Sequence, residues 1–393
     1  MLILYTDLLL INRSESRIAL WVKLTKDYNI YQFPASEYII ESWRKRIEAL
    51  SRIRTESFTH VYAVCLGYRV RCVVRSKEAI ETLRHGPSLQ RFASQIDYHI
   101  VPDNTVPDSY DSALADVQYV IHIAGVWPTP DKHPDNDIYI PFVKSMQNIL
   151  SAAEKVGTVK RVVFTQAGAA MVHPDDGDTL GTAMDMVLNE YTPVHPGLLS
   201  LKPPLASPHH AYCAAKAQCM TTLKNLRASG NLPFSIVQVV PGTVMGPSEL
   251  VSTKMDGRGY MDRMSRALLF NEPKPRYSFG FVHVGDVARV HVEALDDVRI
   301  PYDEVPDWFI AAGASDPSKD GEETWKEAGD FIENNLQHEV ACGMFSVGRD
   351  KVPTNMPYYV DSALTETKLL RHERFKSLKE CIKEVAEWYT TLR

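Results

Sequence analysis

Residues 117–124 read VQYVIHIA, and this nearly continuous apolar run is the stretch that decides the fold. A run of this kind is typical of a strand that is buried on both faces of a parallel sheet. Two similar runs follow along the chain, VKRVVFT at 159–165 and FSIVQVV at 234–240. A further short strand is expected at 67–75, GYRVRCVVR, with a glycine at its start. These runs predict the strands of a parallel sheet.

Helical segments separate the predicted strands. The sequence predicts helices over 77–85, 139–156 and 212–229, and a closing amphipathic helix over 377–392. Alternation of strands and helices indicates an α/β fold with a doubly wound parallel sheet. Ligands of such sheets bind at the carboxyl ends of the strands. The Asp- and Pro-rich stretch 173–210 is expected to be a long loop that is functional or mobile.

The composition excludes several classes of protein. The chain has 393 residues, a formal net charge of −6, 45% hydrophobic residues and 23% charged residues, which is ordinary globular usage. A mildly acidic chain without a basic block is not expected to bind nucleic acid. The apolar run Met1–Ile11 is interrupted by Thr6 and Asp7, so neither a membrane span nor a signal peptide is expected. Six cysteines without a C-x-x-C pair are expected to be reduced thiols of a cytoplasmic protein.

The first 66 residues differ from the remainder because they contain none of the 20 glycines. Within them, Ser36–Arg54 has apolar side chains at helical spacing and Ser36 as a candidate N-cap. This pattern predicts an amphipathic helix. The run Met1–Ile11 is a candidate for the first strand of the sheet.

The segment YCAAK at 212–216 carries a candidate catalytic pair. A spacing of four residues places Tyr212 and Lys216 on the same face of a helix. A free tyrosine has a pKa of about 10 and is a poor acid or base at neutral pH. A neighbouring cation lowers that pKa, which suits a proton donor to a carbonyl oxygen while a hydride attacks the carbon. Because the spacing is common, a chance pair is the alternative interpretation.

Three other segments lie at or after predicted strands. PGTVMGP at 241–247 is expected to be a rigid turn. Its glycines could let the backbone approach a ligand closely, and the alternative is an ordinary turn from strand to loop. HIAG at 122–125 ends a strand with small residues against which a cofactor can pack, although a lone histidine is more often structural. FVHVGDVARVHVEAL at 281–295 contains His283 and His291 without a third ligand nearby, so no metal site is expected.

Taken together, these segments resemble the extended short-chain dehydrogenase/reductases of the NAD-dependent epimerase/dehydratase superfamily, in the dihydroflavonol 4-reductase-like branch. The similarity runs from about residue 57 to the end of the chain. It rests on six segments in order: GYRVRCVVRS (67–76), ADVQYVIHIAG (115–125), VKRVVFTQAGAA (159–170), YCAAK (212–216), PGTVMGP (241–247) and FVHVGDVARVHVEAL (281–295). It implies a Rossmann-type NADP-binding core of residues 57–244 and 281–297. Residues 245–280 and 298–393 would form a smaller C-terminal substrate lobe with the closing helix, and residues 1–56 an atypical N-terminal segment.

The resemblance also implies roles for individual residues. Tyr212 would be the catalytic acid, and Lys216 would lower its pKa and bind the nicotinamide ribose. Arg75 ends the second strand, where an arginine suits the 2′-phosphate of NADP and an acidic residue would suit NAD. The other expected cofactor contacts are His122, Ala124, Gly125, Thr165, Pro241, Gly242, Thr243 and Val244. The implied activity is NADP-dependent interconversion of a small ketone or aldehyde and its alcohol, by a monomer or homodimer.

The chain departs from the family pattern at two places. The family serine that binds the substrate carbonyl corresponds to Ala167, with Gln166 or Thr165 as candidate substitutes. Loss of one such donor costs roughly 10²–10³ in rate in other enzymes. The family's G-x-x-G-x-x-G loop, expected shortly before Gly67, is missing. Since glycines let the backbone approach a pyrophosphate, its loss predicts weak or no binding of NADPH.

Two alternatives to an active reductase remain open. In the first, the chain is a non-catalytic relative that retains the scaffold as a binding or regulatory module. In the second, the first 56 or so residues come from a mistranslated intron or a wrong start joined to an ordinary enzyme.

Overall fold

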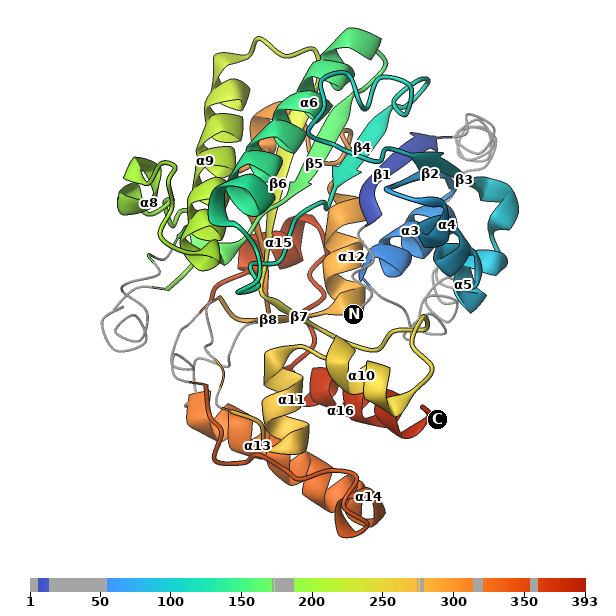
Figure 1. Cartoon of the computed structure of the whole chain (residues 1–393), viewed down its shortest axis with the longest axis vertical. Helices are drawn as coiled ribbons and strands as arrows, with labels where there is room; N and C mark the ends of the chain where they lie inside the picture. Colours follow the sequence, from blue (N-terminus) through green and yellow to red (C-terminus); the bar gives the residue numbers. More distant parts are fainter. Residues whose placement is uncertain are drawn as a thin grey trace, which may run out of the picture.

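A sheet covered by helices on both faces forms the larger part of the molecule, and a smaller group of helices lies below it (Figure 1). The computed structural model describes residues 6–13, 55–171, 173, 187–273, 275, 279–313, 321–353 and 360–393. The α/β fold class expected from the sequence is confirmed. The helix expected over 36–54 lies outside the described residues, as does most of the stretch 173–186.

The main sheet has the strand order β3-β2-β1-β4-β5-β6-β9. Its strands are β1 (Thr6–Arg13), β2 (Tyr68–Val74), β3 (Ile96–Ile100), β4 (Tyr119–His122), β5 (Arg161–Thr165), β6 (Ser235–Pro241) and β9 (Phe309–Ala311). The pairs β2–β3, β4–β5, β5–β6 and β6–β9 are parallel. A small second sheet pairs β7 (Thr243–Met245) with β8 (Phe281–His283) in parallel. The four strands expected from the apolar runs are therefore confirmed.

Burial on both faces explains why the run at 117–124 is apolar throughout. Along β4, Tyr119 and Ile121 belong to the apolar core on one face of the sheet, whereas Val120 belongs to the core on the other. The first core is covered by α3 (Thr55–Cys65), α4 (Lys77–Arg84) and α12 (Val284–Glu293). The second is covered by α6 (Ile140–Val156) and α9 (Pro208–Ser229). This is the doubly wound arrangement that the alternating pattern predicted.

The first strand corrects the expectation of a wholly parallel sheet, because β1 runs antiparallel to both of its neighbours. Thr6 pairs with Val74 at the end of β2, and Arg13 pairs with Tyr68 at its start. Part of the apolar N-terminal run thus fills the strand position between β2 and β4, but it ends at the edge opposite the carboxyl ends of the parallel strands.

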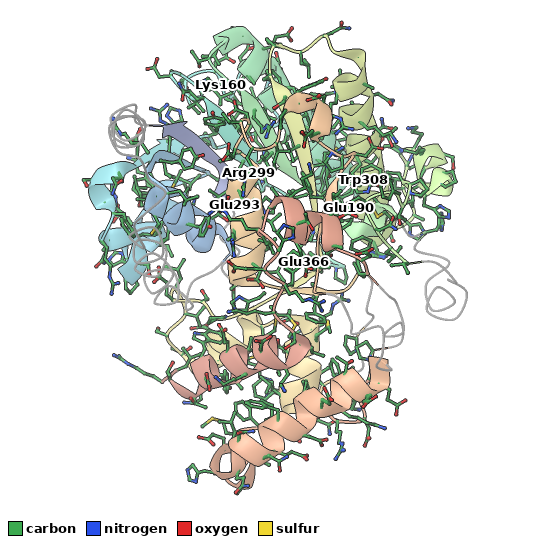
Figure 2. The ribbon with its side chains drawn as sticks, turned by 180° about the vertical axis from the view of Figure 1, so that it is seen from behind. Lys160, Glu190, Glu293, Arg299, Trp308 and Glu366 are labelled. Atoms are coloured by element: carbon green, nitrogen blue, oxygen red, sulfur yellow. The ribbon has the colours of Figure 1, made fainter. Side chains whose placement is uncertain are left out.

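Buried polar contacts fix α3 to α12. Tyr62 donates a hydrogen bond of 2.8 Å to Glu293 Oε1. The other carboxylate oxygen of Glu293 forms an ion pair with Arg299, and Figure 2 shows these two side chains next to each other. The helix that follows the missing glycine loop in the family order is therefore held against the sheet independently of that loop.

The predicted helices begin and end close to the expected residues, with one difference that concerns the site. The helix expected from Tyr212 begins at Pro208, because the Ser207 side chain caps its N-terminus by accepting from the backbone N–H of His210. Proline is well tolerated in the first turn of a helix. Tyr212 consequently lies in the second turn of α9 instead of at its start.

The lower lobe consists of α10 (Lys254–Tyr260), α11 (Arg263–Phe270), α13 (Gly321–Asn335), α14 (Gln337–Ala341) and the closing helix α16 (Leu378–Thr390) (Figure 1). Ser377 and Glu380 form a capping box that starts α16. The division into core and lobe expected from the sequence placed residues 298–393, and with them β9, in the substrate lobe. Val239 of β6 pairs with Phe309, so β9 extends the main sheet instead.

Candidate active site

Tyr212 and Lys216 lie together near the carboxyl end of β5. Lys216 is only 6% exposed, and its Nζ donates a hydrogen bond of 2.9 Å to the backbone carbonyl of Thr165. The same Nζ lies 6.0 Å from the centre of the Tyr212 ring. The structure therefore brings the expected catalytic pair and Thr165 to one place, at the edge where ligands of doubly wound sheets bind.

Phe142, which the sequence reasoning missed, is packed against both members of this pair. Its ring centre lies 4.6 Å from Lys216 Nζ, and it meets the Tyr212 ring edge-on at 5.6 Å. A methyl group placed on Gly125 would come within 2.7 Å of two atoms of the Phe142 ring. The glycine at 125 thus makes room for Phe142. The sequence did offer a sign of this contact. The helix that follows β4 starts near the carboxyl ends of the strands, where Tyr212 and Lys216 were expected, and it carries the aromatic Phe142 in its first turn.

Burial governs the ionisation of the pair. It lowers the pKa of Lys216 from 10.5 to about 8, because the ammonium loses its water. It raises the pKa of Tyr212 above its usual value, which corrects the expectation that Lys216 lowers it. Lys216 is 6.0 Å from the Tyr212 ring and gives a hydrogen bond to Thr165, so its charge does not outweigh desolvation of the phenolate. Tyr212 is accordingly a neutral phenol at pH 7, the protonation state required of an acid.

The two candidate substitutes for the missing serine already have buried partners. Thr165 Oγ1 lies 2.7 Å from His291 Nε2, and the other ring nitrogen of His291 lies 2.7 Å from the carbonyl of Val287. Since that nitrogen must donate to the carbonyl, Nε2 accepts from the threonine hydroxyl. Gln166 is buried and donates to Gln238 Oε1 at 2.9 Å. Neither side chain is arranged to replace a serine at Ala167.

Two of the expected cofactor contacts have clear structural roles. His122 is buried and bonds to Ser145 Oγ at 2.9 Å, and burial lowers its pKa to about 3. This supports the structural interpretation of that histidine. A methyl group on Gly242 would lie 2.8 Å from the backbone of Gly280 and Phe281, so the glycine permits two segments of the chain to approach each other. Pro241, Thr243 and Val244 are half-buried beside it.

Arg75 lines a cavity of about 410 Å³ at the carboxyl ends of β2, β3 and β4. The other lining residues are Pro102, Asp103, Asn104, Thr105, Val126, Lys132, Asn136, Asp137 and Pro141. Its size is in the range of small-molecule sites, and its lining offers cations, amides and carboxylates. The nearby Ala124 is buried in the segment that leads from this cavity toward Phe142 and Tyr212. These features fit the adenosine part of a dinucleotide.

Trp127 is a second residue that the sequence reasoning missed. Its side chain is 56% exposed, and its ring centre lies 6.0 Å from that of Tyr212. The guanidinium of Arg263, from α11 of the lobe, lies 5.9 Å from the Trp127 ring. Core and lobe therefore meet beside the candidate catalytic tyrosine.

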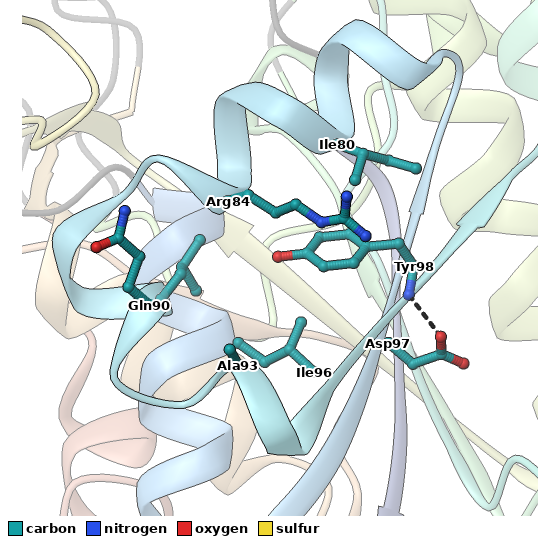
Figure 3. Close-up of a pocket in the computed structure, with 8 residues that line it drawn as sticks. Ile80, Arg84, Gln90, Ala93, Ile96, Asp97 and Tyr98 are labelled. Carbon is teal, nitrogen blue, oxygen red and sulfur yellow. Dashed lines mark hydrogen bonds between the residues drawn. The ribbon is translucent and has the colours of Figure 1, made fainter.

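A separate cavity of about 540 Å³ lies between α4, α5 (Pro87–Gln90) and β3 (Figure 3). The Arg84 guanidinium lies 5.2 Å above the Tyr98 ring there. None of its lining residues belongs to the expected site. In the described part of the chain, no group of three His, Cys, Asp or Glu residues could hold a metal ion. The described helices also include none long and apolar enough to cross a bilayer.

A dinucleotide fits this chain at its two ends but not at its middle. The Arg75 cavity suits the adenosine end, and Tyr212 with Lys216 suits the nicotinamide end. The pyrophosphate would require a glycine loop before α3, and residues 1–66 contain no glycine. In addition, β1 runs antiparallel to β2 and ends at Arg13, opposite the first residue of β2.

Comparison with known proteins agrees with this arrangement. The chain is 28% identical over 255 residues to the NAD-dependent epimerase/dehydratase ALT6 of Alternaria alternata, a match that covers 62% of this chain and 70% of that protein. It is 27% identical over 295 residues to the ketoreductase sphI of Aspergillus fumigatus, which covers 72% and 80% of the two chains.

Solved structures share the fold. The yeast methylglyoxal/isovaleraldehyde reductase Gre2, in complex with NADPH, superposes with a TM-score of 0.63 at 18% identity over 86% of this chain and 96% of that one. Vestitone reductase from alfalfa gives a TM-score of 0.59 at 16% identity over 86% and 95%. The model of the NAD dependent epimerase/dehydratase family matches residues 59–304. The chain therefore belongs to the NAD dependent epimerase/dehydratase family, whose enzymes use a nicotinamide dinucleotide.

Proposed function

We propose that this chain is a reductase of small-molecule ketones or aldehydes that uses NADPH, with Tyr212 as the acid. The observation that carries the proposal is the position of the half-buried Tyr212 beside the buried Lys216, which is hydrogen-bonded to the carboxyl end of β5. The names of relatives such as the ketoreductase sphI and the NADPH complex of Gre2 support the same reaction class.

The chain's own residues would prepare the carbonyl for reduction. NADPH, when bound, supplies the hydride that attacks the carbonyl carbon. Tyr212 holds its proton at neutral pH and gives it to the oxygen as negative charge develops there. Lys216, charged below about pH 8, stabilises the tyrosinate that remains. Phe142 and Trp127 pack against the Tyr212 ring.

Arg75 is the proposed determinant of NADP over NAD. It directly follows β2, at the position in the sequence where an acidic residue would suit NAD. A guanidinium matches the geometry of a phosphate oxygen pair. We further propose that the protein is cytoplasmic and acts as a monomer or homodimer.

A non-catalytic relative is the second candidate function. It is favoured by the buried partners of Thr165 and Gln166, which leave Ala167 without a substitute hydroxyl. It is also favoured by the lack of glycine before Gly67. In that case the cavities would bind a ligand without turning it over.

Turnover by a Tyr212→Phe variant distinguishes the two functions. Oxidation of NADPH at millimolar concentration is followed against a panel of ketones and aldehydes. The proposal predicts measurable turnover by the unchanged chain and a loss of about 10²–10⁴-fold in the variant, because the proton donor is removed and the ring is kept. Tyr191→Phe is the control, since Tyr191 is exposed. Equal turnover by Tyr212→Phe and Tyr191→Phe would defeat the assignment of the acid.

A further inference from the structure

Thr165, the last residue of β5, is bound from both faces of the main sheet. Its side chain points toward α12, where its Oγ1 lies 2.7 Å from Nε2 of His291. Its backbone carbonyl accepts the hydrogen bond of 2.9 Å from Lys216 Nζ, and Lys216 belongs to α9 on the other face. One residue thus connects a buried histidine to the lysine of the candidate catalytic pair.

His291 can only accept a hydrogen bond at this contact. It is 1% exposed, and its Nδ1 lies 2.7 Å from the carbonyl oxygen of Val287, so Nδ1 carries the proton. Burial lowers the pKa of His291 to about 4, so the ring is uncharged at neutral pH and above. The ring therefore keeps one tautomer, and the Thr165 hydroxyl donates to its Nε2.

This contact restrains Thr165 where β5 ends. The peptide after Thr165 is held by β6, because the Gln166 N–H donates to the carbonyl of Val239 at 2.7 Å. The chain then leaves the strand, and a short 3₁₀ turn follows at Gly168–Ala170. The bond to His291 adds a second restraint, on the side chain and from α12. Because a buried acceptor without a donor is unfavourable, this bond resists rotation of Thr165 and a shift of its carbonyl.

We propose that His291 is a positioning residue for Lys216, because it holds Thr165 in the orientation in which the carbonyl at the end of β5 receives the lysine ammonium. The part of this inference that concerns turnover rests on the proposed function. An acceptor at 2.9 Å keeps the ammonium beside Tyr212 and stabilises its charge. A shift of that carbonyl would change both the position and the protonation of Lys216.

Two matched pairs of variants test this connection in the full chain. Thr165→Val removes the hydroxyl and keeps the branched shape, whereas Thr165→Ser keeps the hydroxyl and removes the methyl group. His291→Phe removes the acceptor and keeps an aromatic ring, whereas His291→Gln keeps an acceptor oxygen. The second member of each pair controls for damage to packing, because both members change the same side chain.

The readout is the titration of Lys216, which requires neither cofactor nor turnover. For the unchanged chain and each variant, the free energy of unfolding in urea is measured from pH 6 to pH 10.5, with and without Lys216→Met. The pH at which the difference begins to rise reports the pKa of Lys216 in the folded protein. The neighbouring His122 and Cys219 have pKa values of about 3 and about 12, and burial raises that of Tyr212, so these groups keep one protonation state over this range.

The variants without the hydroxyl or the acceptor should change this titration. Thr165→Val and His291→Phe should move the onset about one pH unit lower, because the ammonium stays buried and its bond to the carbonyl is weakened. Thr165→Ser and His291→Gln should show the onset of the unchanged chain. In NADPH oxidation, Thr165→Val and His291→Phe should also lower kcat about tenfold, with little change in KM for the carbonyl compound.

The outcomes separate this inference from the proposed function. If the onset in Thr165→Val and His291→Phe matches that in Thr165→Ser and His291→Gln, the positioning role is overturned, whatever the loss of stability. If the onset moves as expected but the unchanged chain shows no turnover, His291 positions Lys216 and the proposed reductase function fails. If both members of each pair lower kcat equally and leave the onset in place, the role of His291 is refuted and that of Tyr212 is decided by its own variant.

Discussion

Lys216 Nζ lies 4.6 Å from the centre of the Phe142 ring while it donates its hydrogen bond to the carbonyl of Thr165. An aromatic face attracts an ammonium and at the same time excludes water from it. The lysine is therefore held by two contacts in a buried position, and burial removes its water. Burial in this position lowers the pKa of Lys216. Gly125 also affects the candidate catalytic pair, because it makes room for the Phe142 ring that contacts Lys216 and Tyr212.

The lowered pKa of Lys216 predicts a pH dependence of stability. Between about pH 8 and pH 10.5 the unfolded chain retains a proton that the folded chain has lost, so the free energy of unfolding gains a contribution that rises with pH. The free energy of unfolding of the unchanged chain minus that of Lys216→Met should rise by up to about 3 kcal/mol across this range, because the variant has no lysine to titrate there. Urea unfolding at a series of pH values measures it, with Lys144→Met as an exposed control. A constant difference for Lys216→Met would contradict the burial of a charged lysine.

Gly125→Ala should destabilise the fold and disturb the pair. The new methyl group would stand 2.7 Å from two atoms of the Phe142 ring, so the ring must move away from Lys216 and Tyr212. Overpacking of this kind costs about 1–3 kcal/mol of unfolding free energy. Gly259→Ala is the control, because nothing lies within 4 Å of a methyl group there. Phe142→Leu combined with Gly125→Ala should recover part of the loss; no recovery would mean that the strain arises elsewhere.

Arg75→Asp should reverse the cofactor preference. The exchange places a carboxylate where the 2′-phosphate is proposed to bind, which repels NADPH and offers an acceptor to the ribose hydroxyl of NADH. Affinity for NADPH should fall by about tenfold or more, with little change for NADH. Titrations by fluorescence or calorimetry compare the two. Equal effects on both cofactors would remove Arg75 from the determinants of specificity.

Ala167→Ser should raise the rate of carbonyl reduction, because it restores a hydrogen-bond donor that Thr165 and Gln166, which bond to His291 and Gln238, do not supply. One such donor is worth roughly 10²–10³ in rate elsewhere. The gain should appear in kcat and should be lost again in the double variant with Tyr212→Phe. An unchanged kcat would show that the substrate oxygen does not lie beside residue 167.

The parts of this molecule that sequence predicts best are those buried on both faces. The strand within 117–124 could be recognised because Tyr119 and Ile121 meet the apolar core on one side of the sheet and Val120 meets the core on the other. The direction of β1 could not, since an apolar run reads alike for parallel and antiparallel pairing, and the pairing of Arg13 with Tyr68 depends on where the chain returns.

The site shows the same division. The spacing of Tyr212 and Lys216 is local to one helix, so their proximity followed from helical geometry. The approach of Phe142 and Trp127 depends on how α6 and the loop after β4 pack against α9, which no local pattern records. The pKa of Tyr212 was wrongly expected to fall for a related reason, because the depth of burial is a property of the whole fold.

The affinity of the chain for NADPH is the most direct test, because residues suited to the two ends of the dinucleotide are present and the glycine loop for its pyrophosphate is not. Calorimetry on the unchanged chain should give a dissociation constant well above the low micromolar range. Replacing residues 1–60 by a parallel strand and glycine loop of the family type should restore tight binding, since α3 is already held against α12 through Tyr62 and Glu293. A dissociation constant in the low micromolar range for the unchanged chain would contradict the account and require a different pyrophosphate site.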